Sequence, residues 1–217
     1  MMKTLFDLDN PAIEKLQPIA DLVVVSIMWL VFSMPIITIG AASSAMYYAT
    51  VKVIRHKRET LSKAFLHSFK DNLKQGTIIT LIFAAEVFLT IAYFNNFNTG
   101  MQRFGTAYLI AGIILVLSMG GMIPYAFPII SRFQTTIPNQ LRYIAIMSST
   151  NILTTLILAA MLIASIAIVY QFPFSLLIIP GVYTYLSSLL VERVFLKYTR
   201  NRAKEYSNEN LPWYLEQ

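Results

Sequence analysis

The chain has 217 residues, 56% of them hydrophobic and 13% charged, with a mean hydropathy of +0.60 and a net charge of +6. Because soluble domains carry about a quarter charged residues, this composition excludes an ordinary soluble protein. It predicts an all-α, polytopic membrane helix bundle that forms a single integral membrane domain over residues 1–217. The chain has no cysteine, which excludes disulfides, thiolate metal sites and a cysteine nucleophile.

The first apolar run, Leu22–Val51, contains no charged residue and is interrupted by Pro35 and Gly40. As one helix it would be about 45 Å long, against a hydrocarbon core of about 30 Å. It must therefore tilt, extend into the headgroups or bend at the proline. We expect a single broken crossing, and a re-entrant pair of helices is the alternative.

The break is itself a candidate functional motif, made of Ser33, Pro35, Thr38 and Gly40. Proline removes an amide donor and disfavours the helical conformation of its predecessor, while glycine allows unusual backbone angles. Transporters use such broken helices to present backbone groups to a substrate. The pattern alone favours the simpler interpretation, a proline kink in which Ser33 or Thr38 satisfies the freed carbonyl.

Four further apolar runs predict more membrane spans and bring the total to about five. They are Thr77–Phe94, Thr106–Ile130, Leu141–Tyr170 and Phe174–Val191. The first of these four is short for a span and contains an acid, which makes it the most informative of them.

That acid, Glu86, lies near the middle of its run, and Thr90 and Tyr93 share its helix face at i+4 and i+7. A charged acid at the bilayer centre costs about 2.5–3.5 kcal/mol on insertion scales. The functional interpretation is a proton-relay or substrate-contact residue. The structural interpretation, which we favour, is a protonated acid bonded to Ser118, Asn151 or a backbone carbonyl.

Basic residues are concentrated between alternate apolar runs, which is the distribution expected of cytoplasmic segments. Of the 17 lysines and arginines, only Lys3, Lys15 and Arg103 fall on the opposite side if the first run is a single crossing. The bias places the loop at 52–76 and the C-terminus in the cytoplasm. If the first run is a re-entrant pair, Lys3, Lys15 and the N-terminus become cytoplasmic too.

An amphipathic pattern occupies residues 60–75 within this basic loop. Its apolar stripe recurs every four residues and consists of Leu61, Phe65, Phe69 and Leu73. The bases lie largely off the stripe, at Lys63, Lys70 and Lys74. We expect an interfacial helix that rests on the bilayer and directs these lysines toward anionic headgroups or a docking partner.

No motif in the chain supports catalysis. There is no P-loop, no dinucleotide-binding glycine pattern, no HExxH and no nucleophile elbow. We therefore expect a non-enzymatic protein without a cofactor or metal. The bases flank apolar spans and no nucleic-acid-binding motif accompanies them, so the expected anionic partner is the lipid bilayer and not nucleic acid.

The segment from Phe32 to Lys57, FSMPIITIGAASSAMYYATVKVIRHK, resembles the opening of the YesL family of small polytopic membrane proteins from Gram-positive bacteria. The matching elements are Ser33-Met34-Pro35, Thr38-Ile39-Gly40-Ala41, Ala45-Met46-Tyr47-Tyr48, Lys52 and Arg55. Later landmarks include Arg132-Phe133, Phe172-Pro173 and Val194-Phe195-Leu196-Lys197-Tyr198. The resemblance is dense in the first third of the chain and sparse beyond it.

The resemblance implies a plasma-membrane protein of uncharacterised function whose genes often accompany carbohydrate uptake and polysaccharide utilisation. It implies no catalytic or binding residue, because none is established for the family. The expected function is a non-enzymatic accessory component of carbohydrate uptake, associated with the permease subunits of a sugar ABC transporter or with its sensor. The alternative is a small secondary transporter that uses Glu86 and the broken first span.

Overall fold

The computed structural model describes residues 11–203, and every regular element in that range is helical. The α-helices are α1 (Pro11–Ser33), α2 (Ile39–Ala49), α3 (Leu61–Asn95), α4 (Phe97–Phe104), α5 (Thr106–Arg132), α6 (Ile137–Thr150), α7 (Ile152–Gln171) and α8 (Ile179–Ala203). Three short elements join some of them: η2 (Ile36–Thr38), the π-helical η3 (Thr50–Arg55) and η4 (Pro173–Leu177). The predicted all-α class is confirmed.

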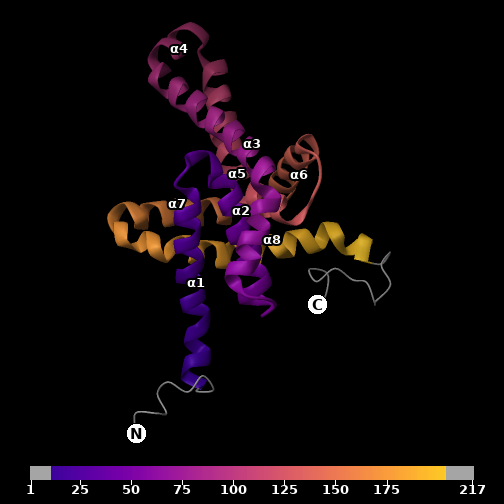
Figure 1. Cartoon of the computed structure of the whole chain (residues 1–217). Helices are drawn as coiled ribbons and strands as arrows, with labels where there is room; N and C mark the ends of the chain where they lie inside the picture. Colours follow the sequence, from indigo (N-terminus) through magenta and orange to yellow (C-terminus); the bar gives the residue numbers. More distant parts are fainter. Residues whose placement is uncertain (1–10, 204–217) are drawn as a thin grey trace.

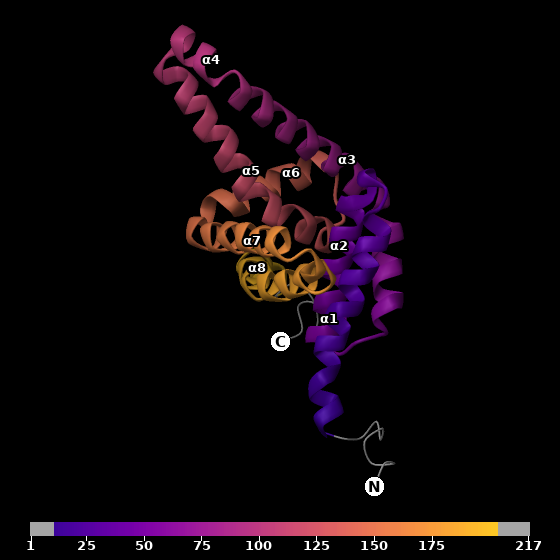
Figure 2. The same cartoon turned by 90° about the vertical axis from the view of Figure 1, so that its left-hand side faces the viewer.

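The first apolar run folds as a helical hairpin, in which α2 turns back and packs beside α1 (Figure 1 and Figure 2). The Trp29 indole N–H of α1 donates to the Ser43 hydroxyl of α2 over 2.9 Å. Pro35 has extended backbone angles, φ −72° and ψ 109°, and so ends α1 instead of bending it. The break is where the sequence places it, but the single crossing is wrong and the paired alternative is correct.

Helix α3 merges two elements that the sequence separates, the amphipathic stretch at 60–75 and the second apolar run. Leu61 and Phe65 of the stripe are buried against the α1–α2 hairpin, and the ring centroids of Phe65 and Phe32 lie 5.5 Å apart. The predicted helix is therefore not a separate one, and its stripe is covered by protein only in part, since Leu73 is 40% exposed. Its first residues pack against the first hairpin. The segment continues without a break into the rest of α3.

The second half of α3, with α4 and the first half of α5, forms an arm that extends from the body (Figure 2). At its tip Tyr93 and Tyr108 stack with ring centroids 4.2 Å apart. The Tyr93 hydroxyl donates to the Tyr108 carbonyl over 2.6 Å, and the Tyr108 hydroxyl donates to the Tyr93 carbonyl over 2.9 Å. These reciprocal bonds fasten the two helices together at the tip.

The predicted fourth span, Leu141–Tyr170, is too long: the chain divides at Asn151 into α6 and α7, and α7 is long and apolar enough to cross a membrane. Asn151 has φ −116° and ψ 54°, outside the helical region, and its side-chain amide donates to the Met147 carbonyl over 3.0 Å. The preceding run Ser148-Ser149-Thr150 is rich in side chains that compete for backbone groups, which favours a break here. Helices α7 and α8 then form a second hairpin that crosses the first (Figure 1).

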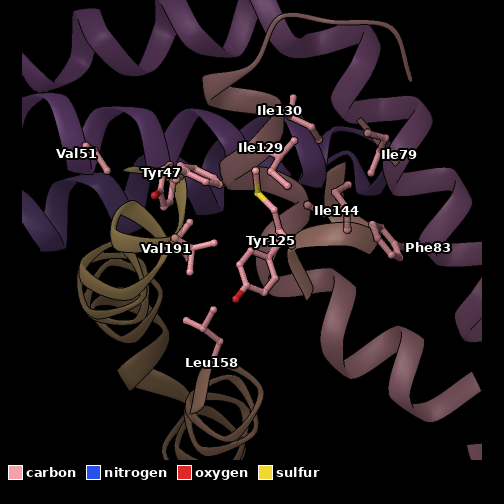
Figure 3. Close-up of a cluster of buried hydrophobic side chains, with 14 residues drawn as sticks. Tyr47, Val51, Ile79, Phe83, Tyr125, Ile129, Ile130, Ile144, Leu158 and Val191 are labelled. Carbon is pink, nitrogen blue, oxygen red and sulfur yellow. The ribbon is translucent and has the colours of Figure 1, made fainter. Parts of the chain in front are cut away.

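Three of these helices, α3, α5 and α7, are long and apolar enough to cross a membrane. The core lies where the two hairpins meet α3, α5 and α6 (Figure 3). Its largest buried side chains include Tyr47, Ile79, Tyr125, Ile129, Ile144, Leu158 and Val191, which come from six different helices. The apolar side chains on the outer faces of the arm and of α7 are exposed, as expected of surfaces that face lipid.

Candidate functional site

A buried ionic triad joins three helices beside the core. Its members are Tyr47 of α2, Arg132 at the end of α5 and Glu192 of α8. One oxygen of the Glu192 carboxylate accepts a hydrogen bond from the Tyr47 hydroxyl over 2.9 Å, and the other is paired with the Arg132 guanidinium. The side chains of Arg132 and Glu192 are only 6% and 9% exposed. Burial removes the screening that weakens surface ion pairs, so this pair is held in a fixed geometry.

Local sequence positions each member. Arg132 is the last residue of α5 and follows the apolar segment Pro128-Ile129-Ile130, which is buried and carries the arginine into the interior. Glu192 follows Val191, whose side chain lies in the core beside Tyr47. The triad therefore sits at the edge of the core, where the ends of apolar segments converge.

The π-helical element η3 adds a second arginine to the same region. The Arg55 guanidinium donates to the Ser188 carbonyl of α8 over 3.0 Å, one turn before Glu192. A π-helix widens the last turn of α2 and redirects the side chains that follow it, and such elements are frequent at functional sites. The buried hydroxyl of Thr50, the first residue of η3, has no hydrogen-bond partner within the described residues.

The loop after η3 is held by ion pairs of Glu59 with Lys52 and, at 3.9 Å, with Lys63 of α3. The Lys52 ammonium lies 2.6 Å from the Glu59 carboxylate and also donates to the Tyr48 hydroxyl over 3.0 Å. The hydrogen bond from Lys52 holds the pKa of Glu59 below its ordinary value. Lys57 and Glu59 both have positive φ, so this connection is a tight turn of defined shape.

Two cavities adjoin the triad. An apolar cavity of about 340 Å³ is lined by residues of α1, α2, α5, α7 and α8, and the Tyr47 ring forms part of its wall. A more polar cavity of about 680 Å³ is lined by Arg132 with Tyr48, Tyr143 and Tyr198 among others. Tyr47 thus lines one cavity and Arg132 lines the other, and both are bonded to the Glu192 carboxylate.

The predicted intramembrane site lies apart from the triad and from both cavities. Glu86 lies on the arm, where it accepts a hydrogen bond from Ser118 of α5, one of the partners expected for a structural role. The Thr90 hydroxyl donates to the Glu86 backbone carbonyl over 2.8 Å, and Tyr93 belongs to the tip. None of the three predicted residues lines either of the two cavities.

The predicted broken-helix residues lie at the tip of the first hairpin. The Thr38 hydroxyl bonds to the carbonyls of Phe32 and Pro35, at 2.6 and 2.7 Å, which is the satisfaction expected of an ordinary break. The buried Ser33 hydroxyl has no hydrogen-bond partner within residues 11–203. Gly40 packs directly against Gly76 of α3.

The predicted docking residues Lys63, Lys70 and Lys74 are all exposed on α3, whereas Leu61 and Phe65 of the stripe beside them are buried. The sequence did not indicate the triad, because Glu192 directly follows the fifth apolar run, and a charged residue at the end of a membrane span is ordinary. Tyr47 and Arg132 do occur in the segments that carry the family resemblance. Within the described residues no group of three histidine, cysteine or acidic side chains could hold a metal ion.

The all-α fold with several long apolar helices defines a multi-pass membrane protein. Residues 22–96 match the model of a family described as "Protein of unknown function, DUF624". The match covers most of the first hairpin and all of α3, and it includes Tyr47 and Arg55 but neither Arg132 nor Glu192. No curated protein and no solved structure matches the chain.

Proposed function

We propose that this protein is a non-enzymatic component of the plasma membrane that assists carbohydrate uptake, in association with the permease subunits of a sugar ABC transporter or with its sensor. The link to carbohydrate rests on the resemblance to the YesL family. The match of the first hairpin and α3 to a family of unknown function falls on the same part of the chain. The proposal therefore assigns the partner-binding role to α3.

The proposal rests on the contrast between the two faces of the first half of α3. One face, including Leu61 and Phe65, is buried against the first hairpin. Lys63, Lys70 and Lys74 remain exposed on the rest of the surface. The helix is held on the first hairpin by its buried face. Its row of exposed lysines is complementary in charge to an acidic surface of a permease subunit, or to anionic headgroups beside it.

Charge reversal of these three lysines to glutamate should abolish capture of the partner when the protein is crosslinked in native membranes and its partners are identified. Arg103→Glu is the matched control, because Arg103 is an exposed base near the far end of α3. Capture of sugar permease subunits should be unchanged in this control. Equal capture by the triple variant, or the absence of any sugar permease among the partners, would contradict the proposal.

A second experiment tests the alternative, a small secondary transporter that uses Glu86 and the broken first span. The acid Glu86, which lies within a candidate membrane-spanning helix and accepts a hydrogen bond from Ser118, is the observation that favours it. Uptake of a sugar by the purified protein in liposomes, lost on Glu86→Gln with normal assembly, would support a transporter with Glu86 on its path. An accessory component should show no uptake by itself.

The hairpin supports a topology in which the loop at 52–76 and the N-terminus share the cytoplasmic side, leaving Arg103 on the other side. The C-terminus, also assigned to the cytoplasm, lies outside the described residues. Because the chain has no cysteine, single thiols can be introduced without background. Thr99→Cys on α4 should react with a membrane-impermeant thiol reagent in intact cells, and Ser62→Cys only after permeabilisation. The reverse pattern would invert the topology.

A further inference from the structure

The apolar cavity lies between the two helical hairpins and the end of α5. Its wall combines Trp29 of α1, Phe127 of α5 and Tyr183 of α8 with aliphatic side chains from α7. Pro124 and Pro128 of α5 and Pro180 of α8 also line it. Its volume of about 340 Å³ falls within the range of about 300–1,000 Å³ that is typical of small-ligand sites.

Apart from that of Tyr183, the hydroxyl groups in the wall offer little to a polar ligand. Those of Ser165, Thr184 and Ser187 donate to carbonyls of their own helices over 2.8, 2.8 and 3.1 Å. The Ser43 hydroxyl accepts the Trp29 indole N–H, and the Tyr47 hydroxyl donates to Glu192. A sugar or a cluster of water molecules in this space would lose hydrogen bonds that the wall does not replace, whereas hydrocarbon would lose none.

The mouth of the cavity indicates where the hydrocarbon comes from. Ile166 of α7 lines the cavity and is 61% exposed, and its neighbour Ile163 is 68% exposed. Helix α7 is one of the three helices that are apolar enough to cross a membrane. The cavity therefore opens sideways onto a surface that faces acyl chains, not onto water.

We propose that this cavity is a binding site for one acyl chain of a membrane lipid, which enters past Ile166 and packs against Trp29 and Tyr47. The site is independent of the proposed role in carbohydrate uptake. It brings lipid into contact with the aromatic ring whose hydroxyl is bonded to Glu192.

Trp29 provides the measurement. The chain has two tryptophans, and Trp213→Phe leaves Trp29 as the only one. Phosphatidylcholine with brominated acyl chains, titrated into this variant in detergent, should quench the Trp29 fluorescence in a saturable manner. Ser165→Phe places a ring in the cavity and should remove more than half of the saturable quenching, because the chain can no longer enter.

Ala164→Phe is the matched control, since Ala164 is the neighbouring residue on α7 and is exposed outside the cavity. Brominated lipid should quench the Trp29 fluorescence of this control as it does in the parent. Ser165→Leu, a smaller filling substitution, covers the case in which the phenylalanine variant fails to fold. Quenching that never saturates, or that is the same with Ser165 filled and unfilled, would show that bromine reaches Trp29 from the surrounding lipid, and would overturn the proposal.

Discussion

Replacing Arg132 with methionine is expected to lower the free energy of unfolding by about 3–5 kcal/mol, the loss typical when one partner of a buried ion pair is removed. The Glu192 carboxylate would keep its hydrogen bond from Tyr47 but lose its cationic partner while the side chain stays buried. The cost is that of desolvating a charge without compensation. The measurement is thermal unfolding in detergent, monitored as the fraction of protein that remains monodisperse on gel filtration after heating.

The double variant Arg132→Met/Glu192→Leu distinguishes a broken pair from a packing defect. Because it removes both charges, it should regain most of the stability that the single variant loses. Arg103→Met, at an exposed arginine, should have little effect. If the double variant is no more stable than Arg132→Met alone, the ion pair is not what makes Arg132 important.

Gly76→Ala is expected to lower the free energy of unfolding by about 1–3 kcal/mol, as overpacking of a tight interior contact does. A Cβ atom on Gly76 would lie 2.6 Å from the Ala41 amide nitrogen and 2.7 Å from its Cα atom. Both are backbone atoms of α2, so relief requires α2 and α3 to separate. Close approach of backbones at small residues is a common way for membrane helices to associate.

Gly40→Ala should be destabilising in the same assay, since its Cβ atom would lie 2.5 Å from the Gly76 carbonyl oxygen. Gly120→Ala is the control: a Cβ atom there meets nothing within 4 Å, so stability should stay the same or rise slightly. Equal losses at Gly76 and Gly120 would indicate a general sensitivity of the helices to substitution, not a contact between α2 and α3.

The fold class and the position of the first break follow from composition and from Pro35, because both depend on local chemistry. The path of the chain after the break does not. Charge counting allows either a crossing or a hairpin, and the decision rests on tertiary contacts such as Trp29 with Ser43. Likewise, the stripe beginning at Leu61 shows that one face must be covered, but not whether protein or lipid covers it.

The candidate site shows the same limit. An acid inside an apolar run, such as Glu86, is visible in the sequence. Ser118, which donates a hydrogen bond to it, was among the partners expected. Glu192 stands at the end of a run, where charges are ordinary. Its significance depends on Arg132, which lies 60 residues away in the chain, and on Tyr47, which lies 145 residues away. Only the packing of α2, α5 and α8 brings them together.

The unbroken length of α3 has a mechanical consequence. The helix contains no proline, and roughly 45 Å of continuous helix separates Lys63 from Tyr93. One continuous helix therefore fixes the separation between the exposed lysines, the contact of Gly76 with α2 and the tyrosine-bonded tip of the arm.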